Sequence, residues 1–474
     1  MTGGHGTGHR ALLHPISYGP ALSPSERAQL CAMAATTWKF FAADLDPHTG
    51  LPRDSLGFGG QPARGNYTSP TDIAMYLWSV TSASDLGLVS HGTAQRLMRA
   101  ELTAIQRLPR WDGFLMSWYD TTTGSVITGP GGTAVSNLTG QFVSTVDNGW
   151  YASALVVARE AFPALAGTAT RLLDQMNFSI FYDNGNQATN ITAGQMYGGY
   201  YVGQGPAGFE YGNLNTDPRI AAYLGMGLGQ LPGDVWWRTW RTLPADFTWQ
   251  TQVPAGPTVT YTDPYSARSF PVVEGHYSYD GISYVPSWGG SAFEALMAPL
   301  VVPETSWGPH SFGANDVNYA EASVRYATDV LHLPVWGLSP SSTPGTVGGY
   351  AAYGADQLGS NLGCCAYAQN VVAPYASFIA LPEIPQQAYR NLMALRAKYP
   401  QLEGPYGLYD AVQPSNGAVA TRYLVLDEGM AMAGLDSALQ GGGLARYFAA
   451  DPVGRHDRPY LAAERFSITP VGSR

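Results

Sequence analysis

The chain has 474 residues, of which 13% are charged, and its formal net charge is −10. An acidic chain whose only lysines are Lys39 and Lys398 has no basic run. This excludes nucleic-acid binding through clustered Lys and Arg. Hydrophobic residues make up 45% of the chain, enough for a sizeable core, but no apolar run approaches the ~18 residues of a membrane helix. Membrane insertion is therefore not expected.

The sequence is rich in aromatic residues, with 12 Trp and 29 Tyr. Their faces pack on sugar C–H surfaces while their polar tips hydrogen-bond, so they suit a neutral polyhydroxylated ligand. The cysteines are Cys31, Cys364 and Cys365, which form neither a disulfide framework nor a metal-ligand spacing. We expect no metal and no cofactor, and Cys364 and Cys365 are predicted to pack as small apolar groups.

The first ten residues lack the apolar segment of a signal peptide. Composition leaves the compartment and the oligomeric state open. A secreted or periplasmic location, with the leader removed, is slightly favoured over a cytoplasmic one.

Residues 1–24 read as a polar lead-in, followed by a single domain over residues 25–474. Apolar residues spaced three or four apart begin at Ser25 and predict a series of amphipathic helices. The later helices are expected at 71–86, 92–108, 148–161, 168–176, 218–226, 291–300, 315–331, 371–380, 385–398 and 426–439. Short β pieces are expected at 114–119, 258–261 and 407–409, and residues 243–284 are expected to form a long irregular insertion. The pattern predicts an all-α fold.

Several phrases in the sequence share one order with a known family. They are WKFF (38–41), DPHTGL (46–51), YTSPTDIAMYL (67–77), VDNGW (146–150), TDPRIA (216–221), PSWGGSAFEALM (286–297), PVWGLS (334–339), VVAP (371–374), YGLYDAV (406–412) and LDEG (426–429). In this order they resemble the glycoamylase-like family that includes endo-β-1,2-glucanases and regions of cyclic β-1,2-glucan synthases. The resemblance implies an (α/α)₆ toroid of about twelve helices and glycosidic-bond chemistry. Asp72, Asp217 and Glu428 depart from the family's usual Asn, Glu and Gln, which leaves the substrate open.

Glycoside hydrolysis needs one carboxylic acid that protonates the leaving oxygen and one carboxylate that activates water. By the family match, Asp217 is the expected general acid and Asp427 the expected general base. Asp217 could instead cap the following helix, where the helix N-terminus would lower its pKa. Nearby Glu210 therefore competes for the role of the acid. Asp427 could instead be a buried structural acid.

Further residues are expected to bind the substrate. Their types are sugar-stacking aromatics and polar groups that bind hydroxyls, and the candidates are Asp147, Trp150, Tyr211, Arg219, Trp288, Glu294, Trp336 and Glu428. For each aromatic the alternative is core packing, for Asp147 a helix cap, and for Glu294 an ion pair with arginine.

We expect a bacterial glycoside hydrolase acting on a β-1,2-glucan-like or a related, furanosyl polysaccharide or oligosaccharide, with inversion. A transglycosylase or retaining glycosidase is the close variant. A polysaccharide lyase, using Tyr211, Tyr277 or His276, and an inactive glycan-binding protein stay open as alternatives.

Overall fold

The computed structural model describes residues 21–471, so most of the predicted lead-in lies outside the described residues. The helices are α1 (Pro24–Asp44), α2 (Pro70–Asp85), α3 (His91–Ile105), α4 (Thr145–Ala161), α5 (Ala166–Leu173), α6 (Arg219–Gly227), α7 (Asp234–Arg238), α8 (Ala292–Leu296), α9 (Glu304–Trp307), α10 (Phe312–Arg325), α11 (Leu362–Cys365), α12 (Tyr375–Ile379), α13 (Pro385–Lys398), α14 (Val425–Gln440), α15 (Ala445–Ala450) and α16 (Pro452–Ala463). Helices dominate the described fold, in agreement with the sequence pattern.

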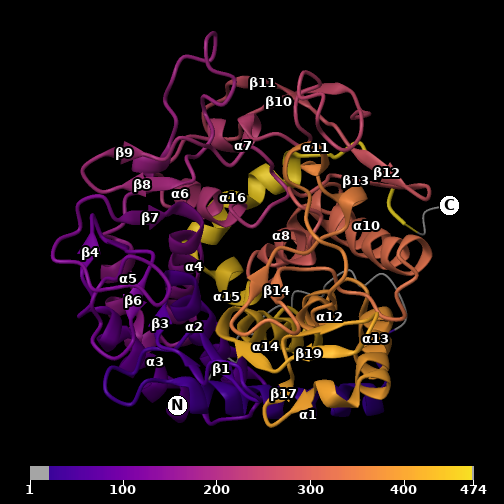
Figure 1. Cartoon of the computed structure of the whole chain (residues 1–474). Helices are drawn as coiled ribbons and strands as arrows, with labels where there is room; N and C mark the ends of the chain where they lie inside the picture. The colour runs from indigo at the N-terminus through magenta and orange to yellow at the C-terminus, as the bar shows by residue number, and fades with distance from the viewer. Residues whose placement is uncertain (1–20, 472–474) are drawn as a thin grey trace, which may run out of the picture.

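Six of these helices contact one another in a closed series. Helix α2 packs on α4 and on α14, α4 packs on α6, and α12 packs on α8 and α14. Arg219 joins α6 to α8 by donating hydrogen bonds to the carbonyls of Glu294 and Ala295. In Figure 1 these helices surround the middle of the molecule. The arrangement fits the expected α/α toroid.

A second set of helices covers the first. Helix α1 packs on α14 and α2, α3 on α2, α5 on α4, α16 on α6, α10 on α8, and α13 on α12. Helix α2 is buried at nearly every position, including Trp78 and Met75. A helix that is buried all round needs neighbours on every side, which the two sets of helices supply.

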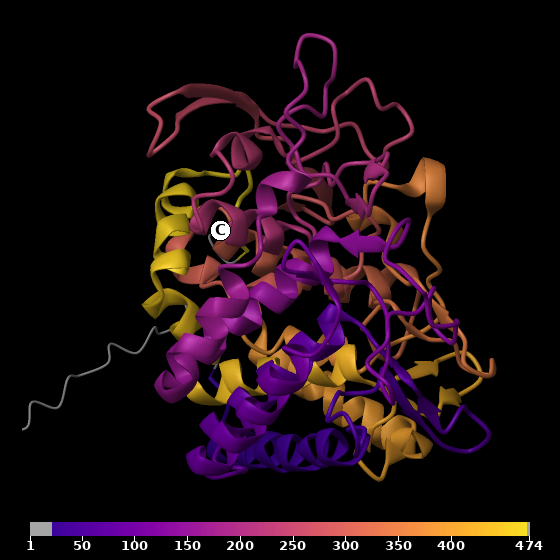
Figure 2. The same ribbon diagram turned by 90° about the vertical axis from the view of Figure 1, so that its left-hand side faces the viewer.

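The strands are short and antiparallel. They are β1 (Ser55–Gly57), β2 (Arg64–Gly65), β3 (Tyr67–Thr68), β4 (Arg110–Trp111), β5 (Phe114–Leu115), β6 (Tyr119–Asp120), β7 (Phe142–Ser144), β8 (Gly199–Tyr201), β9 (Gly205–Pro206), β10 (Thr258–Thr262), β11 (Ser269–Val273), β12 (Tyr277–Tyr279), β13 (Ile282–Tyr284), β14 (Ser341–Ser342), β15 (Tyr350–Ala351), β16 (Glu403–Gly404), β17 (Gly407–Leu408), β18 (Ala411–Gln413), β19 (Ala418–Ala420) and β20 (Arg422–Leu424). They lie mainly on the right-hand side of Figure 2, the face that Figure 1 turns to the viewer.

Three strands lead directly into helices of the inner series, β3 into α2, β7 into α4 and β20 into α14. Ser55 of β1 pairs with Leu424 of β20, and the backbone N–H of Val425 donates to the carbonyl of Asp54 at 3.0 Å. The strands therefore gather at the N-terminal ends of these helices, and this register brings Asp54 beside the start of α14.

The structure corrects several expected elements. The β piece expected at 258–261 is β10, but the rest of the segment 243–284 is less irregular than expected, because it also holds β11 and the hairpin β12–β13. Helix α12 begins only at Tyr375, since Val372 pairs with Val412 in a β-bridge and Pro374 is the N-cap. The pattern did not predict α7, α9, α11, α15 and α16. The first three are five residues or shorter, too short to show a helical period.

Candidate active site

Acidic side chains recur at the starts of the inner helices. Asp72, Asp147, Glu294 and Asp427 lie in the first turns of α2, α4, α8 and α14, and Asp217 lies just before α6. Asp147 is within electrostatic reach of both Asp72 and Asp217. The N-terminal ends of α2, α4 and α6 therefore meet, and their carboxyl groups lie close to one another.

A cavity of about 490 Å³ opens beside Asp217. It brings together five of the predicted site residues, Asp217, Glu210, Tyr211, Trp288 and Glu294. The other aromatic residues of its wall are not among the predicted site residues; they are Phe209, Trp240, Phe247, Trp249 and Tyr367. A wall so rich in aromatic faces, interrupted by a few carboxyl groups, is suited to a polyhydroxylated ligand.

Asp217 does not cap α6. The N-cap is Pro218, and no side chain caps this helix. Burial, together with repulsion from Glu294, raises the pKa of Asp217 from 3.8 to about 8. The expected lowering by the helix N-terminus is therefore outweighed by desolvation and like charge. Asp217 is a carboxylic acid that keeps its proton at neutral pH.

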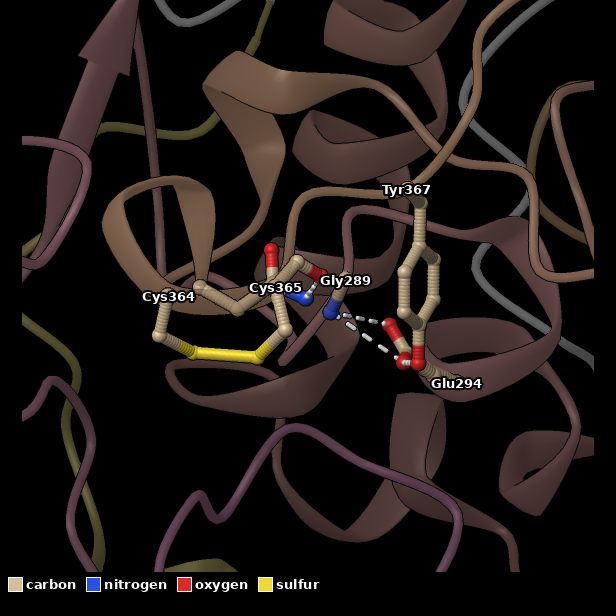
Figure 3. Close-up of a disulfide and its surroundings, with 6 residues drawn as sticks. Gly289, Glu294, Cys364, Cys365 and Tyr367 are labelled. Carbon is tan, nitrogen blue, oxygen red and sulfur yellow. Dashed lines mark hydrogen bonds between the residues drawn. A yellow bond between two sulfur atoms is a disulfide. The ribbon is translucent and has the colours of Figure 1, made fainter.

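Glu294 is held by a network of donors. Its carboxylate accepts hydrogen bonds from the Ser287 hydroxyl at 2.7 Å, the Gly289 N–H at 2.9 Å and the Tyr367 hydroxyl at 3.1 Å. Figure 3 shows the bonds from Gly289 and the Tyr367 ring beside Glu294. With Ser291 it also forms the capping box of α8. These donors are hydroxyl and amide groups, so the alternative of an ion pair with arginine is wrong.

Asp427 belongs to a second group of acids. It is 3% exposed, and burial and repulsion from Asp410 raise its pKa well above the usual range. Asp54 and Glu428 add further repulsion. Like charges that are buried together oppose ionisation, which favours the protonated form of Asp427. Asp427 is thus buried at the end of α14 and not on the outer surface.

One tyrosine lies near the carboxyl groups around Asp217, and another lies near Asp427. Tyr367 is within electrostatic reach of Asp217 and Glu294, and Tyr350 is within reach of Asp427. Asp217 lies just before α6 and Asp427 lies in the first turn of α14, both at N-terminal ends of inner helices. The predicted acid and base therefore lie at the same end of the helix series.

Glu210 and Tyr211, two further predicted residues of the cavity wall, differ in their surroundings. Glu210 is half-buried, and burial raises its pKa. Repulsion from Asp183 adds to this effect, and a hydrogen bond from Thr192 opposes it. Tyr211 is within electrostatic reach of the Asp217 and Asp147 carboxyl groups. Glu210 therefore stays the competing candidate for the acid in the same cavity.

Three other predicted residues are buried among protein side chains. Trp150 is 1% exposed and packs edge-to-face on Trp78, and Trp336 is also buried in the core. Neither ring offers a face to a ligand here, so packing replaces the expected stacking role. Arg219 is buried and paired with Glu304 at 2.8 Å, which occupies its guanidinium.

Two more predicted residues, Asp147 and Glu428, accept hydrogen bonds from threonine side chains. The Thr71 hydroxyl donates to Asp147, whose pKa is raised by burial. Glu428 is 8% exposed and hydrogen-bonded to the Thr37 side chain of α1. Both lie close to the acidic ends of the inner helices without lining the cavity that contains Asp217.

The structure also corrects the expectation for the adjacent cysteines. Cys364 and Cys365 are joined by a disulfide and are exposed, so they do not pack as small apolar groups. They form the last two residues of α11, two residues before Tyr367 of the cavity wall. Among residues 21–471, no helix combines the length and the apolar character needed to cross a membrane.

Comparisons with known proteins agree with this geometry. Residues 255–452 match the Glycoamylase family model, described as "Putative glucoamylase", and residues 32–208 match a model described as a protein of unknown function (DUF3131). The cyclic β-(1,2)-glucan synthase NdvB of Rhizobium meliloti is 23% identical over 91% of this chain. The chain spans 19% of the length of that relative.

Solved structures share the fold. A putative glucoamylase from Bacteroides fragilis has a TM-score of 0.69 at 18% identity, covering 94% of this chain and 98% of that one. An endo-β-1,2-glucanase from Chitinophaga pinensis, in complex with sophorotriose and glucose, has a TM-score of 0.65 at 16% identity, covering 94% and 99%. The endo-β-1,2-glucanase of Talaromyces funiculosus with sophorose has 0.65 at 13% identity, covering 92% and 88%.

The chain therefore has the fold of the putative glucoamylases and endo-β-1,2-glucanases, and its residues 255–452 match the glycoamylase model. The recognition of this group from the sequence phrases is confirmed.

Proposed function

We propose that the protein is a glycoside hydrolase in which Asp217 is the general acid. The observation that carries the proposal is a carboxylic acid with a pKa of about 8 in a cavity walled by aromatic side chains. A catalytic acid must hold its proton at the working pH, and burial beside Glu294 gives Asp217 this property.

Asp217 donates its proton to the glycosidic oxygen as the bond from that oxygen to the anomeric carbon breaks. A water molecule attacks the anomeric carbon, and a carboxylate takes a proton from this water. We assign this role to Asp427, the expected base, whose carboxyl group lies beside that of Asp410. The proton released by the water balances the one given to the leaving group.

The substrate is a β-1,2-glucan or a related glycan, with a furanosyl polysaccharide as the open variant, and the reaction proceeds with inversion. Support comes from the glucanases that share the fold and from the aromatic wall, on which Trp288 and Tyr211 would stack sugar rings. We take the fold to be an (α/α)₆ toroid in a single domain over residues 25–474. Transfer to a sugar hydroxyl is the close alternative, favoured by the similarity to a glucan synthase.

A location outside the cytoplasm fits this function. Disulfides persist in oxidising compartments and are rare in the cytosol, so the exposed Cys364–Cys365 bond supports a secreted or periplasmic protein.

Purified protein incubated with β-1,2-glucan, arabinan, galactan and fructan tests the proposal. We expect cleavage of one glycan, and NMR of the first product should show the inverted anomer. Asp217→Asn and Asp427→Asn should each lose activity, whereas Asp174→Asn, an exposed acid after α5, should not. Folded protein that cuts none of these glycans would contradict the proposal. An unsaturated, ultraviolet-absorbing product would indicate a lyase instead.

A further inference from the structure

The Cys364–Cys365 disulfide lies at the rim of the cavity. Both cysteines are exposed, whereas Tyr367, two residues later, lines the cavity and donates its hydroxyl to Glu294 at 3.1 Å. Figure 3 shows the disulfide in the turn that precedes Tyr367, with Gly289 next to Cys365 and Glu294 next to the Tyr367 ring. A reductant can therefore reach the bond from solvent.

The turn around the disulfide is attached to two tryptophans of the cavity wall. The Gly363 N–H donates to the carbonyl of Trp249 at 3.1 Å, and the Asn361 N–H donates to the carbonyl of Trp288 at 3.1 Å. The two indole rings meet edge-to-face at 6.0 Å. The Asn361 side chain closes the turn by donating to the Cys365 carbonyl at 2.9 Å. The turn is thus bonded to the backbone of both tryptophans of this aromatic wall.

Close packing fixes the other end of the segment. Gly289 has no side chain, and a Cβ at this position would collide with the ring of Tyr367. The phenol ring therefore lies directly against the backbone of the loop that carries Trp288. The segment from Asn361 to Tyr367 is held at both ends by groups of the cavity, and the disulfide constrains the short turn between them.

We propose that the Cys364–Cys365 disulfide is a redox-controlled positioning element for substrate binding. The closed bond holds Trp249 and Tyr367 in the geometry of the cavity wall. Its reduction frees the turn and weakens glycan binding without removing the acid that acts on the glycosidic bond. This inference rests on the proposed hydrolase function.

The redox step is a thiol–disulfide exchange with an external dithiol. A thiolate of the dithiol attacks one sulfur and forms a mixed disulfide, and its second thiol then releases the protein. The S–S bond of Cys364–Cys365 breaks and accepts two electrons and two protons. The dithiol loses the same number and becomes a cyclic disulfide.

Thiol titration with a chromogenic aromatic disulfide, under native conditions, tests whether the bond exists. We expect one reactive thiol per chain from the exposed Cys31, and three after treatment with dithiothreitol and its removal. The Cys31→Ser variant should have no reactive thiol before this treatment and two after it. Three reactive thiols in protein that has never met a reductant would overturn the proposal.

Kinetics of the oxidised and reduced enzyme on the cleaved glycan test the positioning role. We expect reduction to raise KM about three- to tenfold, the range of a weakened aromatic contact, with kcat within about twofold. Reoxidation should restore KM. Cys31→Ser should respond like the natural chain, whereas the double variant Cys364→Ser, Cys365→Ser should have the raised KM with or without reductant. An unchanged KM on reduction, or an equal loss of kcat, would overturn the proposal.

Tryptophan fluorescence separates this result from a failure of the proposed function. Reduction should change the emission of the Trp249–Trp288 pair in the natural chain and in Cys31→Ser, but not in the double cysteine variant. If no glycan is cleaved, the hydrolase proposal fails while the thiol count and the emission still decide whether the disulfide controls the wall. Emission that does not respond to reduction contradicts such control.

Discussion

Replacing Asp217 by asparagine removes the proposed acid while keeping the shape of its side chain. The natural carboxyl has a pKa of about 8, so it is about nine-tenths protonated at pH 7. Asparagine has no proton to give to the leaving oxygen. Because general acid catalysis contributes ~10²- to 10⁴-fold, we expect kcat of Asp217→Asn to fall by that range.

The same substitution should stabilise the fold. Between its usual pKa of 3.8 and the raised pKa of about 8, the folded state holds a proton on Asp217 that the unfolded chain has released. The free energy of unfolding therefore falls as pH rises through this window, by ~1.4 kcal/mol for each pH unit. The upper limit over the window is ~6 kcal/mol. Asparagine has no such penalty, so above about pH 8 the variant should unfold a few degrees higher.

Two measurements check this reasoning. The kcat/KM of the natural enzyme should fall about tenfold for each pH unit above about pH 8, and thermal unfolding of the variant and of the natural chain should converge toward about pH 4. A variant that keeps full activity would refute the assignment of the acid. A variant that is less stable than the natural chain at about pH 9 would refute the reading of the raised pKa.

Trp288→Ala should raise KM about three- to tenfold, because it removes an aromatic face of the cavity. The control is Trp111→Ala, which should leave KM unchanged because the Trp111 ring stacks on Tyr200 and does not line the cavity. Initial rates at increasing glycan concentration measure both KM values. Gly289→Ala should raise KM and lower the melting temperature, because the added methyl group displaces the Tyr367 ring that packs on Gly289. Gly92→Ala is the control and should change neither quantity, because the space around Gly92 is open. Arg219→Gln should lower the free energy of unfolding by ~3–5 kcal/mol, since it leaves a buried carboxylate without its partner, and chemical denaturation should show the loss.

Local sequence predicted most of the longer helices. The helix expected at 71–86 is α2, which begins at Pro70 behind a capping box between Ser69 and Asp72. Helix α13 begins and ends at the predicted residues. The hairpins between residues 258 and 284 were harder to predict, because only β10 shows a run rich in β-branched residues.

The candidate site was predicted in part. Asp217, Glu210, Tyr211, Trp288 and Glu294 were singled out and lie around one cavity. The phrase that contains Asp410 was noticed, but no local feature of the sequence shows that this acid faces Asp427.

The sequence by itself determined the helical periods, the capped starts and the identity of the acids that follow them. These properties depend on residues three or four positions apart, so they can be read along the chain. Only the tertiary structure decided which aromatic rings face the cavity and which, like Trp150, fill the core. It alone raised the pKa of Asp217, because burial and the charge of Glu294 arise when segments 77 residues apart in the chain meet. Protonation depends on surroundings in space, which no local pattern records.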